Sequence, residues 1–328
     1  MPKPVQIGLV SVLIPAYNRE SYIRNTLDSV RLQSFRPIEI VVVDDGSTDQ
    51  TAAEIRLWAD QLDDEQINVV LVPQANQGAD AARNAAMHAS SGEFVQFLDS
   101  DDLLHPEKLS ECLKQFRNAE VDTVVGQFEI FRDPQEIAAK LKNAPEHREF
   151  RLDGERRPFY TRMGWELWVP MFRRSLLKAA GPMRVGIRAG GAYAYTTLLK
   201  LHSNKRAYVP LGLNFYRRGV DNALTGIGNL ERVPATASVM QWIHDSLLKF
   251  GISDRSEWKD FTLKSLNAYR KSVAVGVEQG RAQLYALSRD AGWRWNPLVG
   301  ALLRFPEPIT RALLMSMVRG KRLLRRAG

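Results

Sequence analysis

"IEIVVVDDGSTDQTAAEIRLWADQL", residues 38–62, contains the clearest indication of the fold class of this chain. Its first part, "IEIVVVDD", is a largely apolar run that ends on two acids, which is typical of a strand buried in a parallel sheet. The second part opens with helix-capping residues and then places four apolar residues on one helical face: Ile55, Trp58, Ala59 and Leu62. A buried strand followed at once by an amphipathic helix predicts an α/β fold.

The same alternation continues on both sides of this stretch. Before it, "VSVLIPAY" (10–17) predicts a strand and "ESYIRNTLDSVRLQS" (20–34) a helix. After it come two further strand and helix pairs: "INVVLVP" (67–73), "GADAARNAAMHAS" (78–90), "EFVQFLD" (93–99) and "PEKLSECLKQFRN" (106–118). Strands this apolar, separated by helices, predict a mostly parallel, Rossmann-like sheet with helices on both faces.

The second half of the chain has a looser pattern. "VDTVVGQFEIFR" (121–132) and "RAYVPLGLNFYRR" (206–218) predict strands, and "GWELWVPMFRRSLLKAAG" (164–181) predicts a strand or turn that leads into a short helix. From about residue 233 the pattern is helical. We therefore predict a first domain over residues 1–232, with halves of about 1–128 and 129–232, and a helical C-terminal region over 233–328.

The composition is that of a globular protein, with 45% apolar and 25% charged residues among 328. The net charge of +8 is concentrated at the end of the chain, where residues 304–328 hold seven Lys or Arg and one acid. The basic character therefore belongs to a tail and not to a nucleic-acid-binding core. The single cysteine, Cys112, falls on an apolar helix face and excludes an internal disulfide framework. With no signal-peptide pattern and no apolar run of ~18 residues, we expect a cytoplasmic protein.

Polar residues gather where the predicted strands end, and ligands of parallel sheets bind at that edge. "QFLDSDDLLHP" (96–106) places Asp99, Asp101 and Asp102 within four positions. The cluster admits three interpretations: a solvated helix-capping turn, a phosphoryl-accepting pocket like that of receiver domains, or a divalent-cation site. A receiver domain would be much shorter and would carry a lysine after its last strand. Carboxylates at i and i+2 offer hard oxygen ligands to Mg²⁺ or Mn²⁺, which then bridges to substrate phosphates.

Two other strand ends carry candidate ligand-binding residues. Asp45, in "VVVDDGSTD", is placed to accept hydrogen bonds from a base N–H or a ribose hydroxyl, or alternatively to form a turn that caps the next helix. Tyr17, in "PAYN", is placed to stack on a base, or alternatively to pack within the protein.

Four motifs follow one another in a fixed order: "VSVLIPAYNRESYIRNTLDSVRLQS", "EIVVVDDGSTDQT", "NQGADAARNAAMHASSGEFVQFLDSDD" and "HPEKL". With these motifs the chain closely resembles the family 2 glycosyltransferases, which have the GT-A fold. The resemblance is strong over residues 8–130, weak over 130–220 and absent from the C-terminal helices. It implies inverting, metal-dependent transfer of a sugar from a nucleotide-sugar donor to a glycan or lipid-linked acceptor hydroxyl.

The resemblance also assigns roles to residues of this sequence. It implies that Pro15 and Tyr17 line the base pocket and that Asp45 binds the edge of the base. Asp99 would lie near the ribose and the metal, with Asp101 as the principal ligand of Mg²⁺ or Mn²⁺. Arg83 would lie near the donor, where it pairs either with phosphate or with an acid of its own domain.

The sequence departs from the family pattern at the general base. The resemblance implies an acidic pair at the start of a helix, but the matching positions hold Gly191 and Ala192. A shift of two positions gives Tyr193 and Ala194, and no acid lies between Glu166 and Asp221. Substitutes for the base are Glu166, His202 and Asp221. A nucleotide-sugar-binding protein with impaired catalysis is therefore the alternative function.

Two further points concern the class of function. A sugar nucleotidyltransferase would carry a glycine-rich, basic loop after its first strand, where this chain has "PAYNRES", so we discount that class. The tail "FPEPITRALLMSMVRGKRLLRRAG" (305–328) interleaves apolar residues with arginines. It suits an interfacial helix at the inner face of the cell membrane, as in polysaccharide biosynthesis on lipid-linked acceptors, or a basic helix that packs on its own domain.

Overall fold

The computed structural model describes residues 3–133, 135, 137, 167–187, 190–219, 229–251, 261, 262, 265, 266, 268, 269 and 281–295. The chain divides into two compact units, Met1–Gly226 and Ile227–Gly328. The second unit begins with the long helix α9 (Asn229–Lys249), so this helix starts before the predicted division at residue 232.

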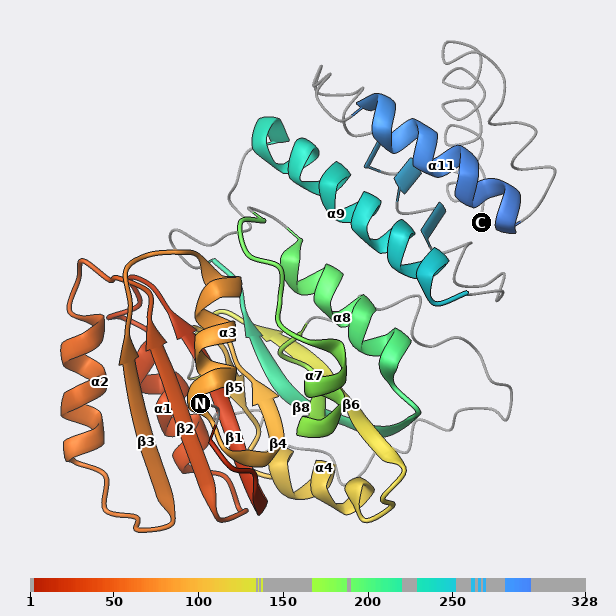
Figure 1. Ribbon diagram of the computed structural model, residues 1–328. Coiled ribbons are helices and arrows are strands. Elements are labelled where there is room, and N and C mark those ends of the chain that lie inside the picture. The colour runs from red at the N-terminus through yellow and green to blue at the C-terminus, as the bar shows by residue number, and fades with distance from the viewer. Residues whose placement is uncertain are drawn as a thin grey trace, which may run out of the picture. The chain divides into compact units, whose positions relative to one another are not determined.

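The first unit is built on one sheet of eight strands in the order β3-β2-β1-β4-β7-β6-β8-β5 (Figure 1). Strands β1 to β4 are parallel to one another, whereas β7 runs antiparallel to both β4 and β6. At the far edge β6 pairs parallel with β8, and the short β5 pairs antiparallel with β8. The strands are β1 (Gln6–Ala16), β2 (Ile38–Asp44), β3 (Ile67–Pro73), β4 (Gly92–Phe97), β5 (Leu103–Leu104), β6 (Val121–Phe131), β7 (Met171–Arg173) and β8 (Lys205–Arg217). The predicted mostly parallel sheet is confirmed.

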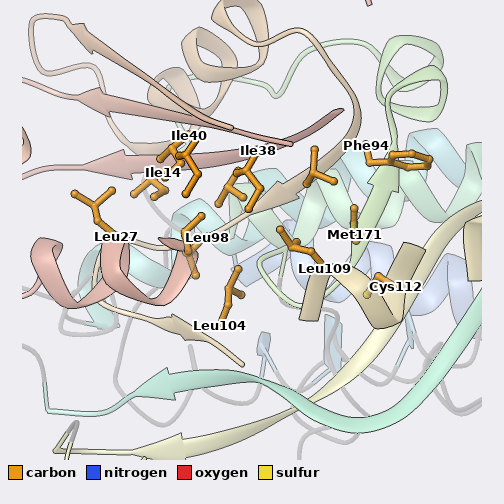
Figure 2. Close-up of a cluster of buried hydrophobic side chains, with 14 of the residues drawn as sticks. Ile14, Leu27, Ile38, Ile40, Phe94, Leu98, Leu104, Leu109, Cys112 and Met171 are labelled. Atoms are coloured by element: carbon orange, nitrogen blue, oxygen red, sulfur yellow. The ribbon is translucent and has the colours of Figure 1, made fainter. Parts of the chain in front are cut away.

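Helices cover both faces of this sheet, and strand periodicity decides which side chains meet them. Val12 of β1 points to one face, where it joins a cluster with helices α1, α2 and α4; Figure 2 shows part of this cluster. The next residue, Leu13, points to the other face and packs with α3, α7 and α8. In Figure 1, α3 lies in front of the strands and α1 behind them. The helices are α1 (Ile23–Arg31), α2 (Thr51–Asp60), α3 (Ala79–Ala89), α4 (Lys108–Phe116), α7 (Arg174–Ala180) and α8 (Gly191–His202).

The single cysteine lies in the first unit. Cys112 is fully buried on α4, as expected for a structural thiol.

In the second unit, α9 packs against α11 (Arg281–Trp295), and Nε2 of His244 lies 2.7 Å from a carboxylate oxygen of Asp290. None of the helices in the described part of the chain has the length and apolar character needed to cross a membrane. The basic tail at 305–328 lies outside the described residues.

The turn that precedes α2 is held by Asp49. One oxygen of its carboxylate accepts hydrogen bonds from the backbone N–H and the hydroxyl of Thr51, at 2.9 Å and 2.5 Å. The other accepts the backbone N–H of Glu20, at 3.2 Å, so the turn before α2 is tied to the turn before α1. Burial acts to raise the pKa of Asp49, but these hydrogen bonds outweigh it and lower the pKa.

Asp49→Ala is expected to reduce the free energy of unfolding by about 1 kcal/mol at neutral pH, because it removes a helix-end acceptor. Since the folded-state pKa lies below the ordinary value of 3.8, this stabilisation is fully present above that pH and is lost as the pH falls through the folded-state pKa. Urea denaturation of both proteins from pH 7 to pH 2 measures the difference. Asp63→Ala, which removes an exposed carboxylate, is the control. A difference that persists unchanged at pH 2 would contradict the assignment.

Candidate functional site

The acidic turn between β4 and β5 brings three carboxylates to the carboxyl edge of the sheet. The backbone N–H of Asp102 donates to the carbonyl oxygen of Asp99 at 3.1 Å, which closes the turn. The three side chains then enter different environments. Asp99 and Asp101 are partly exposed, whereas Asp102 is completely buried.

Asp99 is paired with Arg83 of α3. Nη2 of Arg83 lies 2.8 Å from Oδ1 of Asp99, and Nη1 lies 3.1 Å from Oδ1 of Asp80, one turn earlier on the same helix. Burial acts to lower the pKa of Arg83, but the charges of Asp99 and Asp80 outweigh it and raise the pKa. Of the two partners that the sequence allowed for Arg83, the structure shows the acid of its own domain, and pairing with a phosphate stays a prediction.

Asp101 faces Arg19, which belongs to the loop after β1. Nε of Arg19 lies 3.4 Å from Oδ2 of Asp101. Burial raises the pKa of Asp101 and the nearby charge of Asp99 raises it further, while Arg19 acts in the opposite direction. The pKa of Asp101 is raised on balance, so the charges of Arg19 and Arg217 only partly offset burial and the charge of Asp99.

Asp102 belongs to the core and not to the open site. Its Oδ1 accepts the backbone N–H of Arg217 at 2.8 Å, and the Arg217 Nε donates to the carbonyl oxygen of Asp101 at 2.9 Å. Burial, with the charges of Asp99 and Asp101, raises the pKa of Asp102 well above its ordinary value. The sequence did not point to Arg217. No motif marks it, and only the pairing of β8 with β5 brings it under the turn.

The loops after β1 and β2 carry the residues predicted to contact a base. Tyr17 is 44% exposed at the end of β1, while Pro15 is buried within the strand. Asn18 follows in a left-handed conformation, with φ of 51°. Its side-chain oxygen accepts the backbone N–H of Thr48 at 2.9 Å, which fastens the loop after β1 to the loop after β2.

Asp45 is buried and holds the loop that leads from β3 into α3. Its Oδ1 accepts hydrogen bonds from the Gln74 side chain and the Gln77 backbone, at 2.7 Å and 2.9 Å. Its Oδ2 accepts the backbone N–H of Gly78 at 2.8 Å. The first turn of α3, and with it Asp80 and Arg83, is thus positioned by the carboxylate of Asp45, the residue that follows β2.

The helix α8 begins at the two positions where the family resemblance implies an acidic pair that this chain lacks. Gly190 has φ of 89°, which favours glycine, and the helix begins at Gly191 and Ala192. His202 ends the same helix, about 16 Å away along its axis, with Nδ1 3.0 Å from the carbonyl oxygen of Leu198. The structure therefore does not bring His202 to the start of α8. Glu166 and Asp221, the other predicted substitutes for the base, lie outside the described residues.

The chemistry of Asp99 and Asp101 fits a divalent cation shared with a substrate. Arg83 contacts Oδ1 of Asp99 and Arg19 approaches Oδ2 of Asp101, and each carboxylate has a second oxygen. Within the part of the chain that the structure describes, no group of three or more His, Cys, Asp and Glu side chains is arranged as a complete metal site. Mg²⁺ and Mn²⁺ accept one or two carboxylates when substrate phosphates and water supply the other ligands.

Comparison with protein families and curated proteins gives a consistent result. A family model described as glycosyl transferase family 2 matches residues 11–180. The putative glycosyltransferase EpsH of Bacillus subtilis is 33% identical over 178 residues, which are 52% of this chain and 48% of EpsH. Glycosyltransferase GlyA of Streptococcus pneumoniae is 36% identical over 126 residues, 38% of this chain and 18% of GlyA. The chain thus aligns with less than half the length of each of these relatives.

Solved structures share the fold at low sequence identity. TarS 1–349 of S. aureus, crystallised with UDP-GlcNAc, has a TM-score of 0.69 and 19% identity, over 92% of this chain and 87% of that one. The mannosyltransferase PcManGT of Pyrobaculum calidifontis, in complex with GDP-Man and Mn²⁺, has a TM-score of 0.52 and 18% identity, over 97% of this chain and 82% of that one. The predicted GT-A fold is confirmed.

Proposed function

The chain belongs to glycosyl transferase family 2, and from this premise we propose that it transfers a sugar from a nucleotide-sugar donor to an acceptor hydroxyl with the help of Mg²⁺ or Mn²⁺. The observation that carries the proposal is the acidic turn, which presents Asp99 and Asp101 at the carboxyl edge of the sheet, where α/β folds bind their ligands. The nucleotide sugars bound by TarS and PcManGT support a donor of this class.

In this proposal the loops after β1 and β2 hold the nucleoside. The exposed ring of Tyr17 stacks on the base, which needs an aromatic face and little else. Asp45 accepts a hydrogen bond from the edge of the base while it continues to hold the loop before α3. A carboxylate offers about four acceptor positions, and Gln74, Gln77 and Gly78 use three of them. Pro15 supports this pocket from within β1.

The diphosphate lies over the acidic turn. Asp101 and Asp99 hold the cation, which, when bound, neutralises the charge that develops on the leaving nucleoside diphosphate. Arg83 fixes the orientation of the Asp99 carboxylate, and Arg19 lies beside Asp101 on the same edge, where a guanidinium pairs readily with phosphate oxygens. We propose inverting transfer of a hexose, with a glycan or lipid-linked saccharide as acceptor.

A second function is favoured by one specific observation. Inverting transfer requires a base near the acceptor hydroxyl, and the start of α8 offers Gly191 and Ala192 there. The alternative is therefore a protein that binds nucleotide sugar in a cation-dependent way without turnover. In either case we propose a cytoplasmic protein whose basic tail contacts the membrane surface, a part that lies outside the described residues.

The two functions are separated by measuring donor binding and donor consumption on the same protein. A panel of UDP-, GDP- and dTDP-sugars is incubated with Mn²⁺ or with EDTA, with saccharide acceptors and without them. We expect nucleotide release that depends on Mn²⁺ and increases with an acceptor. Cation-dependent binding without release across the panel would favour the binding protein, and no nucleotide binding at all would overturn both.

A further inference from the structure

Asp80 of α3 occupies the space that a side chain at position 191 would need. A Cβ atom added to Gly191 would lie 1.7 Å from Oδ2 and 2.7 Å from Cγ of Asp80. Both distances are shorter than any real contact of such an atom. The carboxylate of Asp80 from α3 can therefore lie at the start of α8 because position 191 has no side chain.

This carboxylate is joined to the acidic turn through one guanidinium. Arg83 lies between Oδ1 of Asp80, at 3.1 Å, and Oδ1 of Asp99, at 2.8 Å. The Nε of Arg83 is buried and has no hydrogen-bond partner among the described residues, so the two carboxylates are what orient the guanidinium. Burial raises the pKa of Asp80, and Arg83 is the charge that opposes this effect. The amino end of α8 adds a partial positive charge next to the same carboxylate.

The charges of this trio decide what Asp99 can do. Asp80, Arg83 and Asp99 together carry one net negative charge, whereas Arg83 and Asp99 alone would form a neutral pair. A neutral pair attracts a cation far less than a pair that shares its arginine with a second acid. Asp80 thus leaves Asp99 both oriented and negatively charged at the edge of the turn.

We propose that Asp80 supplies from α3 the carboxylate that position 191 of α8 lacks, and that it is a positioning residue, which holds Arg83 against Asp99 and keeps this end of the acidic turn competent to bind a cation. The inference rests on the proposed function, because it concerns the same donor site. It makes Asp80 and Gly191 a matched pair, in which the carboxylate of Asp80 requires a glycine at position 191 for space.

The alternative role of Asp80 is a local one. An acid in the first turn of a helix stabilises that helix through the macrodipole, whatever stands at position 191. A local role therefore predicts that Asp80→Asn lowers the thermal midpoint and leaves Mn²⁺-dependent binding unchanged, whereas a positioning role predicts that this binding weakens.

The test is a double-variant cycle of Asp80→Ala, Gly191→Asp and the protein with both changes. UDP and GDP are the probes, and their affinity is measured with Mn²⁺ and with EDTA, together with the thermal midpoint of each variant. Each single change is expected to weaken Mn²⁺-dependent binding about 10-fold or more, as is usual for groups that orient metal ligands. The double variant moves the carboxylate from α3 to α8 and occupies about the same volume. Its Mn²⁺-dependent affinity for the nucleotide is expected to lie within about 3-fold of the wild-type value.

Two matched variants separate charge from shape. Asp80→Asn keeps the volume and removes the charge, and it should weaken Mn²⁺-dependent binding while EDTA values stay unchanged. Gly191→Ala should lower the thermal midpoint in the presence of Asp80 and have little effect in the Asp80→Ala background. The inference is overturned if Asp80→Asn binds the nucleotide with wild-type affinity in Mn²⁺, or if the double variant binds no more tightly than the weaker of the two single variants. Either result leaves the proposed function standing. A wild type that binds neither probe with Mn²⁺ overturns the proposed function and this inference with it.

Discussion

Asp101→Ala is expected to reduce Mn²⁺-dependent nucleotide binding and sugar transfer by at least about 100-fold, equivalent to about 2.7 kcal/mol. Asp101 is the acid of the turn that lies near Arg19, in the loop after β1. Burial and the charge of Asp99 both disfavour its ionised form and raise its pKa. A divalent cation removes that repulsion, so cation and carboxylate stabilise each other. Alanine leaves Asp99, already paired with Arg83, as the one predicted ligand.

Calorimetric titration of UDP and GDP with Mn²⁺ and with EDTA, together with an assay of nucleotide release, measures this effect. Asp63→Ala is the matched control, because it also removes one carboxylate but from an exposed position. The circular dichroism spectrum of Asp101→Ala should match that of the wild type, since Asp102, and not Asp101, is the buried acid of the turn. Unchanged affinity and unchanged cation dependence would refute the assignment of Asp101 as a ligand.

Glu39→Ala is expected to reduce the free energy of unfolding by about 3 kcal/mol or more while nucleotide binding stays intact. Glu39 lies in β2 with 2% of its surface exposed. Its Oε2 accepts hydrogen bonds from the Ser11 hydroxyl at 2.6 Å and the Ser91 backbone at 2.8 Å, and its Oε1 accepts the Ser91 hydroxyl at 3.0 Å. Removing the carboxylate leaves these buried donors without an acceptor.

A buried arginine makes the loss of Glu39 more severe. Arg174 donates to the carbonyl oxygen of Gly92 and to the hydroxyl of Ser90, next to the Glu39 network. Burial lowers the pKa of Arg174, and the charge of Glu39 opposes this effect. Alanine at 39 would leave the guanidinium with less compensation in a buried place.

Urea denaturation measures the stability of Glu39→Ala, with Glu65→Ala as the control for an exposed glutamate. Nucleotide binding should survive at temperatures where the variant is folded, because Glu39 is near the start of β2 and Asp45 follows its end. A loss of less than 1 kcal/mol, or a loss of nucleotide binding by the folded variant, would contradict a purely structural role.

Local sequence patterns are enough to predict the helices and strands of the first half and the edge of the sheet at which polar residues gather. "INVVLVP" is the strand β3 to the residue, and "IEIVVVDD" and "GADAARNAAMHAS" contain β2 and α3 with differences of one residue at their ends. These elements were predictable because their periodicity and apolar runs are local properties. The position of Asp99 and Asp101 at a strand end was predictable for the same reason.

Tertiary structure alone decided which charged residues belong to the site. Asp101 and Asp102 are adjacent in the sequence, yet Asp102 is buried in the core, where it accepts the backbone N–H of Arg217 from β8. Glu39 lies near the start of β2 and Asp45 directly follows its end, yet Glu39 binds buried serines and Asp45 holds the loop before α3. Gly191 looked like the loss of a carboxylate, and the structure places Asp80 of α3 against it. The physical reason is that a charge takes its role from the burial and the partners around it, and those partners come from segments far away in the chain.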